Sequence, residues 1–326
     1  MEKFNLNIVG ASGLVGQTFL KILEEENFPI ARLNLYSGMT SSGTAVIFKG
    51  QRYILQKTDE LPDCDFTLLA TDSDVSKKYA KTAKRHSRYI IDNSSAFRLE
   101  NNIPLVVPEI NFSLPVNGNI IANPNCSTAI CAIPLHLLNK YYGLTQVRIC
   151  TYQSVSGSGK KGLAALNGIK NDAYKYDIRS TCIPQIGKFD KYGYTTEENK
   201  LRDELRKILL LPDLPVGATC VRVPVKNCHA LAVSAVLKKD FDIVNIRSLF
   251  STADGLTVLD EPENCIYPVS TVGVNSNKVY IGRIRKDQAE ENSILFYVLS
   301  DNLRRGAAYN AYKIIKTIIE SQNSGK

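Results

Sequence analysis

The sequence contains the stretch Leu6-Asn7-Ile8-Val9-Gly10-Ala11-Ser12-Gly13-Leu14-Val15-Gly16, which decides the expected fold. A short apolar strand runs directly into a glycine turn, and an amphipathic helix follows that closes near Asn27-Phe28-Pro29. The glycines permit a tight turn and a close approach of the backbone to a pyrophosphate, which then rests on the helix N-terminus. An ordinary strand-to-helix turn is the alternative. The placement between an apolar strand and a helix favours a dinucleotide-binding domain.

The second strand, residues 32–36, is expected to end beside the adenosine ribose of such a dinucleotide. An NAD-selective site usually has an acidic residue there, to hold the ribose hydroxyls. This chain instead reads Ser37-Gly38-Met39-Thr40-Ser41-Ser42-Gly43, with no carboxylate. Hydroxyls and backbone N–H groups suit a 2′-phosphate, so NADP is the expected cofactor.

Strand and helix patterns then alternate. We expect a hairpin over 45–56, strands at 65–70 and 88–91, and a helix at 74–86, which together predict a doubly wound sheet. A helix after Cys126 contains Pro134, where we expect a kink or an early break. The pattern in the second half of the sequence predicts strands at 147–153, 219–225, 229–237, 278–285 and 293–299. It also predicts a helix at 196–211, with a Thr195/Glu198 capping box, and a terminal helix opened by 301–308.

Length and composition limit the class of protein. The 326 residues, 44% apolar and 22% charged, fit about two soluble globular domains. No signal-peptide pattern and no apolar run of ~18 residues is present, so a cytoplasmic enzyme is expected. The eight cysteines form no CxxC pair, which argues against a zinc site or a disulfide framework, and we expect no metal. The net charge of +8 is spread along the chain without a nucleic-acid-binding motif and suits anionic metabolites.

Cys126 lies between an apolar strand at 119–122 and a helix expected to begin at Ser127 or Thr128. Free backbone N–H groups at a helix start lower the pKa of a nearby thiol, and they can stabilise an oxyanion on an attacked carbonyl. The alternative is a small buried hydrophobe, which describes most cysteines of a globular protein. Position therefore makes Cys126 the candidate nucleophile among the eight.

Three histidines are available to serve that cysteine. His86 lies in a basic helix and is expected to be solvated. His136 is ten residues into the helix after Cys126, roughly 15 Å from its start, which is too far to reach back. His229 begins a strand and can approach a thiol at a helix start, so it is the candidate acid/base partner.

Three further charged residues, Glu197, Lys200 and Arg222, lie in predicted helices and strands. Glu197 and Lys200 lie three residues apart on one helix face, where a surface ion pair of ~0.2–0.5 kcal/mol is the expected role. Arg222 lies between Val221 and Val223, and strand periodicity points it to the opposite face from these apolar neighbours.

The combined motifs resemble the aspartate-semialdehyde dehydrogenases. The matching stretches extend over nearly the whole chain, in the same order: 10–16, 92–98, 107–111, 123–128, 151–157, 195–200, 222–229, 282–285 and 301–308. The resemblance implies an α/β protein with an N-terminal Rossmann-type NADP-binding domain, residues 1–126 plus the helix 303–326. It also implies an α+β catalytic and dimerisation domain, residues 127–302.

The activity that the resemblance implies is reductive dephosphorylation of L-4-aspartyl phosphate by NADPH, through a thioacyl enzyme, in lysine, threonine and methionine biosynthesis. Implied catalytic residues are Cys126, His229 and Gln153. Implied substrate-binding residues are Asn125, Arg222 for the α-carboxylate, Glu197 for the α-amino group, and Arg98 with Lys200 for the phosphate. Implied cofactor contacts are Gly10, Ser12, Gly13, Leu14, Val15, Gly16, Thr40, Ser41, Ser156, Gly157 and Asn302.

Two alternatives remain at this point. The related N-acetyl-glutamyl-phosphate reductases are expected to carry glycine before the cysteine, where this chain has Asn125. A non-catalytic NADP-binding paralogue is expected to lose its nucleophile or an anion-binding arginine, yet Cys126, His229, Arg98 and Arg222 are all present. The resemblance also implies a homodimer, possibly a tetramer, that acts on a small molecule without nucleic acid or membrane.

Overall fold

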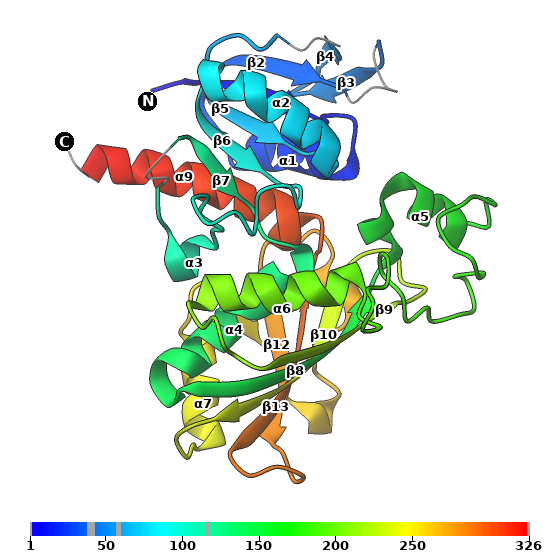
Figure 1. Cartoon of the computed structure of the whole chain (residues 1–326), viewed down its shortest axis with the longest axis vertical. Helices are drawn as coiled ribbons and strands as arrows, with labels where there is room; N and C mark the ends of the chain where they lie inside the picture. The colour runs from blue at the N-terminus through cyan, green and yellow to red at the C-terminus, as the bar shows by residue number, and fades with distance from the viewer. Residues whose placement is uncertain (1, 38–42, 57–59, 115–117, 325–326) are drawn as a thin grey trace. The chain divides into compact units, whose positions relative to one another are not determined.

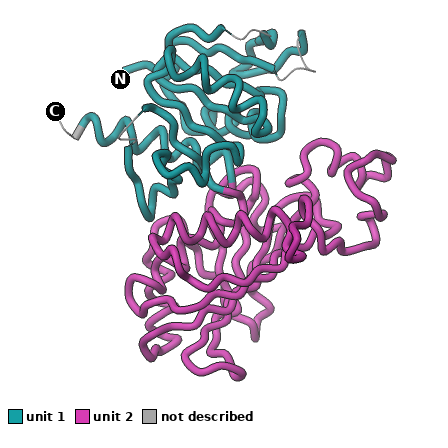
Figure 2. The backbone as a smooth tube through the Cα atoms, viewed as in Figure 1, with its two compact units in different colours: residues 1–124, 307–326 teal, residues 125–306 magenta. Residues whose placement is uncertain are grey.

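The structure is a computed structural model that describes residues 2–37, 43–56, 60–114 and 118–324. Two compact units make up the chain (Figure 2). The first comprises residues 1–124 and 307–326, and the second comprises residues 125–306.

The first unit is built on a parallel sheet in the order β2-β1-β5-β6-β7. Its strands are β1 (Phe4–Val9), β2 (Ile30–Tyr36), β5 (Cys64–Leu69), β6 (Ser87–Asp92) and β7 (Ile120–Ala122), and a hairpin adds β3 (Ala45–Phe48) and β4 (Gln51–Ile54). The helices are α1 (Leu14–Glu25), α2 (Ser73–His86), the short α3 (Pro108–Asn111) and α9 (Tyr309–Ser324).

Alternation along the central strands divides the core of this unit into two apolar layers. Leu6 and Ile8 of β1 pack with residues of α1 and α9, whereas Val9 packs with residues of α2. Helices therefore cover both faces of an all-parallel sheet, which confirms the doubly wound class expected from the alternating pattern.

The second unit is built on a mixed sheet in the order β11-β12-β13-β10-β8-β9 (Figure 1). Its strands are β8 (Leu144–Gln153), β9 (Val216–Arg222), β10 (His229–Leu237), β11 (Leu256–Val258), β12 (Val279–Lys286) and β13 (Ser293–Ser300). The helices are α4 (Cys126–Tyr142), α5 (Gly159–Leu166), α6 (Thr196–Leu209), α7 (Ile243–Ser251) and α8 (Ser270–Gly273). Single turns of 3-10 helix lie at η1 (Val155–Ser158) and η2 (Pro262–Asn264).

The two faces of this sheet differ in exposure. Along β8, Ile149, Thr151 and Gln153 are buried, and α4 and α6 pack on the sheet. The residues between them, Cys150 and Tyr152, are exposed on the other face. This alternation assigns one face to the core and leaves the other open in the single chain.

Two expectations about helices need correction. The early break at Pro134 does not occur, because α4 continues to Tyr142; Pro134 lies among buried residues of α4, so packing offsets the missing N–H. The terminal helix is preceded by a π-helical turn, η3 (Arg304–Ala308), in which the Gly306 N–H donates to the Asp301 carbonyl. Among the described helices, none has the length and apolar character that a bilayer crossing requires.

Candidate functional site

The glycine turn of the first unit leaves a helix start open to an anion. Gly10 has φ +88°, and a Cβ there would lie 2.3 Å from the Ala70 carbonyl oxygen. A Cβ on Gly16 would lie 2.4 Å from the Gly10 carbonyl oxygen, so both positions require glycine. Gly13 is the N-cap of α1 and supplies no side-chain cap. The turn from Ser12 to Val15 therefore has the form that suits a dinucleotide pyrophosphate, whereas Thr40 and Ser41 lie outside the described residues.

Cys126 is itself the first residue of α4, whereas the helix was expected to begin at Ser127 or Thr128. Asn125 is the N-cap, and its Oδ1 accepts from the N–H groups of Ser127 at 2.9 Å and Thr128 at 3.4 Å. The expectation that these N–H groups are free at the sulfur is therefore wrong, because an asparagine N-cap satisfies them. Cys126 is partly exposed at a helix start, whereas burial raises the pKa of the Cys220 thiol to about 12.

Two buried carboxylates of α6 hold Asn125. Its Nδ2 donates to Glu197 Oε1 at 2.9 Å, and its backbone N–H donates to Glu204 Oε2 at 2.6 Å. Gln153 Nε2 also donates to Glu197 Oε1, at 3.1 Å. Glu197 is only 7% exposed, so it is no surface ion-pair residue, and it joins the residue beside Cys126 to the end of β8.

Three candidate residues lie in one row across the second sheet. Arg222 pairs with Gln153 between β9 and β8, and Gln153 pairs with His229 between β8 and β10. All three side chains are buried on the face covered by α4 and α6. The sequence expectation that Arg222 lies opposite Val221 is confirmed by this register, and the arginine occupies the more buried side.

The His229 imidazole is fully buried. Its Nδ1 lies 3.1 Å from both the backbone nitrogen and the hydroxyl of Ser154. Its Nε2 has no hydrogen-bond partner among the described residues. Burial, with a further contribution from the Arg222 charge, holds the pKa of His229 well below its ordinary value, and the Cys228 backbone opposes this in part. The ring is therefore neutral at physiological pH.

Arg222 and His229 meet beneath Gly157. The arginine donates from one terminal nitrogen, Nη1, to the Ser154 carbonyl at 2.7 Å, and its Nε has no partner among the described residues. A Cβ on Gly157 would lie 2.7 Å from that Nη1 and 3.0 Å from His229 Nε2. Glycine at residue 157 therefore leaves room for the Arg222 guanidinium and the His229 imidazole.

The remaining candidates lie nearby or in the other unit. Ser156 and Asn302 are buried, and the Ser156 hydroxyl donates to Asn302 Oδ1 at 3.0 Å. Lys200 is half-buried on α6, one turn after Glu197. Arg98 belongs to the first unit, where its guanidinium donates to the backbone carbonyls of Asn123 and Asn93 at 2.9 Å each.

The other two histidines take no part in this arrangement. His86 Nδ1 lies 2.8 Å from Asp63 Oδ1, so the expected solvated ring has a carboxylate partner. His136 is half-buried within α4. Over residues 2–37, 43–56, 60–114 and 118–324, no group of three His, Cys, Asp or Glu side chains could hold a metal ion.

Sequence reasoning missed three residues at the site. Glu204 holds the Asn125 N–H, Ser154 contacts His229, and Gly306 packs against Cys126, where an added Cβ would lie 2.9 Å from the cysteine Cβ. Glu204 follows Glu197 by seven residues, which places two carboxylates on one helix face, and this spacing could have identified it.

Two family models match most of the chain. Residues 5–114 match the family described as semialdehyde dehydrogenase, NAD binding domain, and residues 135–305 match semialdehyde dehydrogenase, dimerisation domain. The aspartate-semialdehyde dehydrogenase of Bacillus subtilis is 40% identical over 95% of this chain and 96% of its own length. That of Aquifex aeolicus is 37% identical over 97% and 98%. The crystal structure of aspartate semialdehyde dehydrogenase II complexed with ASA from Vibrio cholerae superposes with a TM-score of 0.93 and 34% identity, covering 98% of this chain and 99% of that one.

Proposed function

The chain belongs to the aspartate-semialdehyde dehydrogenase family, and on that premise we propose the reaction and the role of each site residue. The reaction is the NADPH-dependent reductive dephosphorylation of L-4-aspartyl phosphate to L-aspartate 4-semialdehyde, in lysine, threonine and methionine biosynthesis. The observation that carries the assignment is the set of contacts that joins Asn125, beside Cys126, through Glu197 to Gln153, and the strand register that places His229 next to Gln153.

Cys126 is the nucleophile. Its thiolate forms a C–S bond to the aspartyl carbonyl carbon, the bond from that carbon to the phosphate oxygen breaks, and phosphate leaves. NADPH, when bound, supplies the hydride that reduces the resulting thioester. The C–S bond then breaks, which releases the aldehyde and returns the sulfur to the thiolate form.

Two residues of the sheet serve the reacting centre. Gln153 orients the substrate, since its amide already lies against Glu197 at the end of β8. His229 is the acid/base partner and acts through Nε2, because Nδ1 is occupied by Ser154. Both side chains are held by buried contacts, which fixes their orientation before substrate binds.

The charged groups match the three charges of the substrate. Arg222 binds the α-carboxylate, and its buried Nε without a partner among the described residues supports this role. Glu197, with Asn125, binds the α-amino group. Arg98 and Lys200 bind the phosphate, an assignment that rests on the family motifs.

The cofactor would be held by the glycine turn and by residues of the second unit. The start of α1 has no side-chain cap, and glycine at residues 10 and 16 allows the tight turn that precedes it. Such a turn fits the pyrophosphate of NADP. The residues assigned to it are Gly10, Ser12, Gly13, Leu14, Val15, Gly16, Thr40, Ser41, Ser156, Gly157 and Asn302. The lack of a carboxylate over residues 37–43 supports NADP over NAD.

The test is NADP reduction with aspartate semialdehyde in phosphate and in a non-nucleophilic buffer. Phosphate-dependent turnover that is lost in Cys126→Ala is expected, because phosphate must cleave the thioester. N-acetyl-glutamate semialdehyde serves as the competing substrate. Turnover that persists in Cys126→Ala, or a preference for the acetylated substrate, would contradict the assignment.

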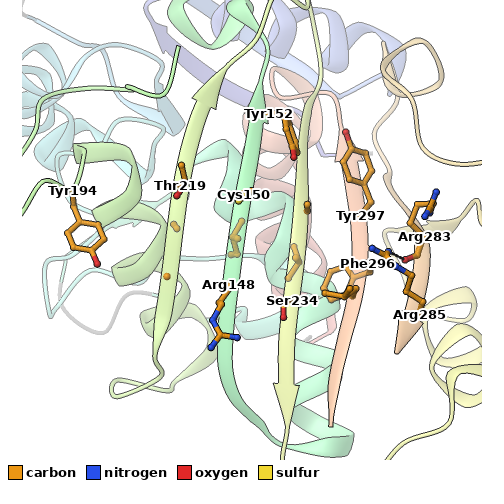
Figure 3. Close-up of a pocket in the computed structure, with 16 residues that line it drawn as sticks. Arg148, Cys150, Tyr152, Tyr194, Thr219, Ser234, Arg283, Arg285, Phe296 and Tyr297 are labelled. Carbon is orange, nitrogen blue, oxygen red and sulfur yellow. Dashed lines mark hydrogen bonds between the residues drawn. The ribbon is translucent and has the colours of Figure 1, made fainter. Parts of the chain in front are cut away.

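We further propose that the open face of the second sheet is covered by a second copy of the chain. This face has a hollow of about 680 Å³. Tyr152 from β8 and Tyr297 from β13 are among the residues that line it (Figure 3). Tyr152 is 42% exposed in the single chain, and the family domain over 135–305 is described as a dimerisation domain. The same face carries the arginines Arg148, Arg283 and Arg285, and aromatic and arginine side chains are enriched at protein interfaces.

Sedimentation of an Ala232→Asp variant tests this dimer, because Ala232 lies in the hollow. We expect the variant to sediment as a monomer while the wild-type chain sediments as a dimer. Ile47→Asp is the matched control, since Ile47 is 75% exposed on β3 of the first unit. A monomeric wild-type chain, or an Ala232→Asp variant that stays dimeric, would contradict the proposal.

A further inference from the structure

The Ser154 hydroxyl lies between His229 and Asn302. Its Oγ is 3.1 Å from His229 Nδ1 and 3.0 Å from Asn302 Oδ1. The Ser154 backbone N–H also points at Nδ1, at 3.1 Å. All three residues are at most 3% exposed, so water does not compete for these contacts.

The Ser154 backbone N–H determines which nitrogen of the His229 imidazole carries the proton. A backbone N–H can only donate, so Nδ1 of a neutral ring must be the acceptor, and the single ring proton is on Nε2. A proton on Nδ1 would face the Ser154 N–H, with the Ser154 hydroxyl as an acceptor within reach. The Ser154 N–H therefore favours the Nε2–H tautomer, whereas the hydroxyl, together with the Cys228 backbone, can stabilise a charged ring.

Asn302 fixes the orientation of that hydroxyl. Its Oδ1 lies within hydrogen-bond distance of three donors: the Ser154 hydroxyl at 3.0 Å, the Ser156 hydroxyl at 3.0 Å and the Cys228 backbone N–H at 3.1 Å. One carbonyl oxygen has two lone pairs, so these donors already saturate it. The family motif assigns Asn302 to the cofactor, yet this oxygen is engaged within the protein. Cys228 directly precedes His229, so Asn302 also holds the start of β10.

We propose that Ser154 and Asn302 are positioning residues that hold His229 as the Nε2–H tautomer. The proposal rests on the role of His229 given above and specifies it: the resting ring presents a hydrogen-bond donor, rather than a lone pair, at Nε2. That atom is buried and has no partner among the described residues, and it lies beside Arg222 under Gly157. A developing negative charge on sulfur or oxygen is the group such a donor would meet.

Two variants are expected to shift the titration midpoint of the His229 ring in opposite directions. Asn302→Asp keeps an acceptor for all three donors and adds a negative charge behind the Ser154 hydroxyl. It should raise the titration midpoint of the ring by on the order of one pH unit. Ser154→Ala removes the side-chain acceptor for an Nδ1 proton, so it should lower that midpoint and reduce kcat by about fivefold. Ser293→Ala is the matched control, because it removes a buried hydroxyl of the same sheet whose partners are Ser234 and Asp287.

The measurement is ¹⁵N NMR of the histidine rings in the full-length enzyme without substrate, which is practical because the chain has three histidines. Assignment uses a His229→Gln sample. We expect Nε2 to carry the proton, the midpoint to rise in Asn302→Asp, and the midpoint to stay unchanged in Ser293→Ala. A proton on Nδ1 in the resting enzyme would overturn the proposal, as would an Asn302→Asp variant that changes only the KM for NADPH.

The same data separate the proposal from the proposed function. The NMR signals report the tautomer whether or not the enzyme turns over. An Nε2–H ring in an enzyme whose kcat is unaffected by His229→Gln would refute the acid/base role and leave the tautomer assignment standing. A normal acid/base pH profile with the proton on Nδ1 would support the acid/base role and refute the tautomer assignment.

Discussion

Gly157→Ala is expected to impair catalysis without unfolding the protein. The added methyl would lie 2.7 Å from Arg222 Nη1 and 3.0 Å from His229 Nε2. The guanidinium has little freedom to retreat, because Arg222 is 4% exposed and its Nη1 is bonded to the Ser154 carbonyl. The clash therefore forces a shift of one of the two groups or of Gly157 itself.

The size of the effect follows from that overlap. Overpacking a filled site by one methyl costs about 1–3 kcal/mol. If that cost falls on the groups that bind the transition state, kcat/KM should fall by about 5- to 150-fold, at 1.36 kcal/mol per factor of ten.

The assay is phosphate-dependent NADP reduction, with thermal unfolding measured on the same samples. Gly217→Ala is the control, because a Cβ there meets nothing within 4 Å and Gly217 is also in the second sheet. The reasoning would be refuted if Gly157→Ala kept kcat/KM within twofold of wild type. It would also be refuted if Gly217→Ala lost as much.

Three further predictions use the same contacts. Glu204→Gln should lower kcat by about tenfold, since a neutral amide is a weaker acceptor for the buried Asn125 N–H, and steady-state kinetics with intact thermal unfolding would check it. Gly306→Ala should slow alkylation of Cys126 by iodoacetamide, because its methyl would lie 2.9 Å from the cysteine Cβ; an unchanged alkylation rate would count against this packing. His229 has a lowered pKa in the folded state, so its contribution to stability is present above pH ~6.5 and is lost as pH falls toward the folded pKa. Urea unfolding from pH 8 to 5 should therefore show a slope of up to about 1.4 kcal/mol per pH unit that is absent in His229→Gln.

Local pattern was sufficient for most of the fold. The strand, glycine turn and helix at 6–25 follow from apolar periodicity and from positions that only glycine can occupy. The capping box of Thr195 and Glu198 was also readable from four consecutive residues. Pro134 was misjudged because the rule for exposed helices does not include the packing that surrounds α4.

The site was only partly readable, because its contacts join residues far apart in the chain. Position at a helix start selected Cys126, elimination among the histidines selected His229, and the family motifs gave Arg222 its role. No local pattern predicts that Glu197 would be buried against Asn125, 72 residues away, or that Asn302 would reach Ser154, 148 residues away. The N-cap at Asn125 was missed because a helix boundary shifts by a residue once a side chain caps it.

Acyl transfer to Cys126 is tested most directly by mass spectrometry of the enzyme mixed with L-4-aspartyl phosphate in the absence of NADPH. The sample is quenched in acid, digested and searched for an aspartyl thioester, with Cys126→Ala as the control. The account predicts one adduct, on the peptide that contains Cys126, and its disappearance when NADPH is added before the quench. An adduct on another residue, or one that survives in Cys126→Ala, would contradict it.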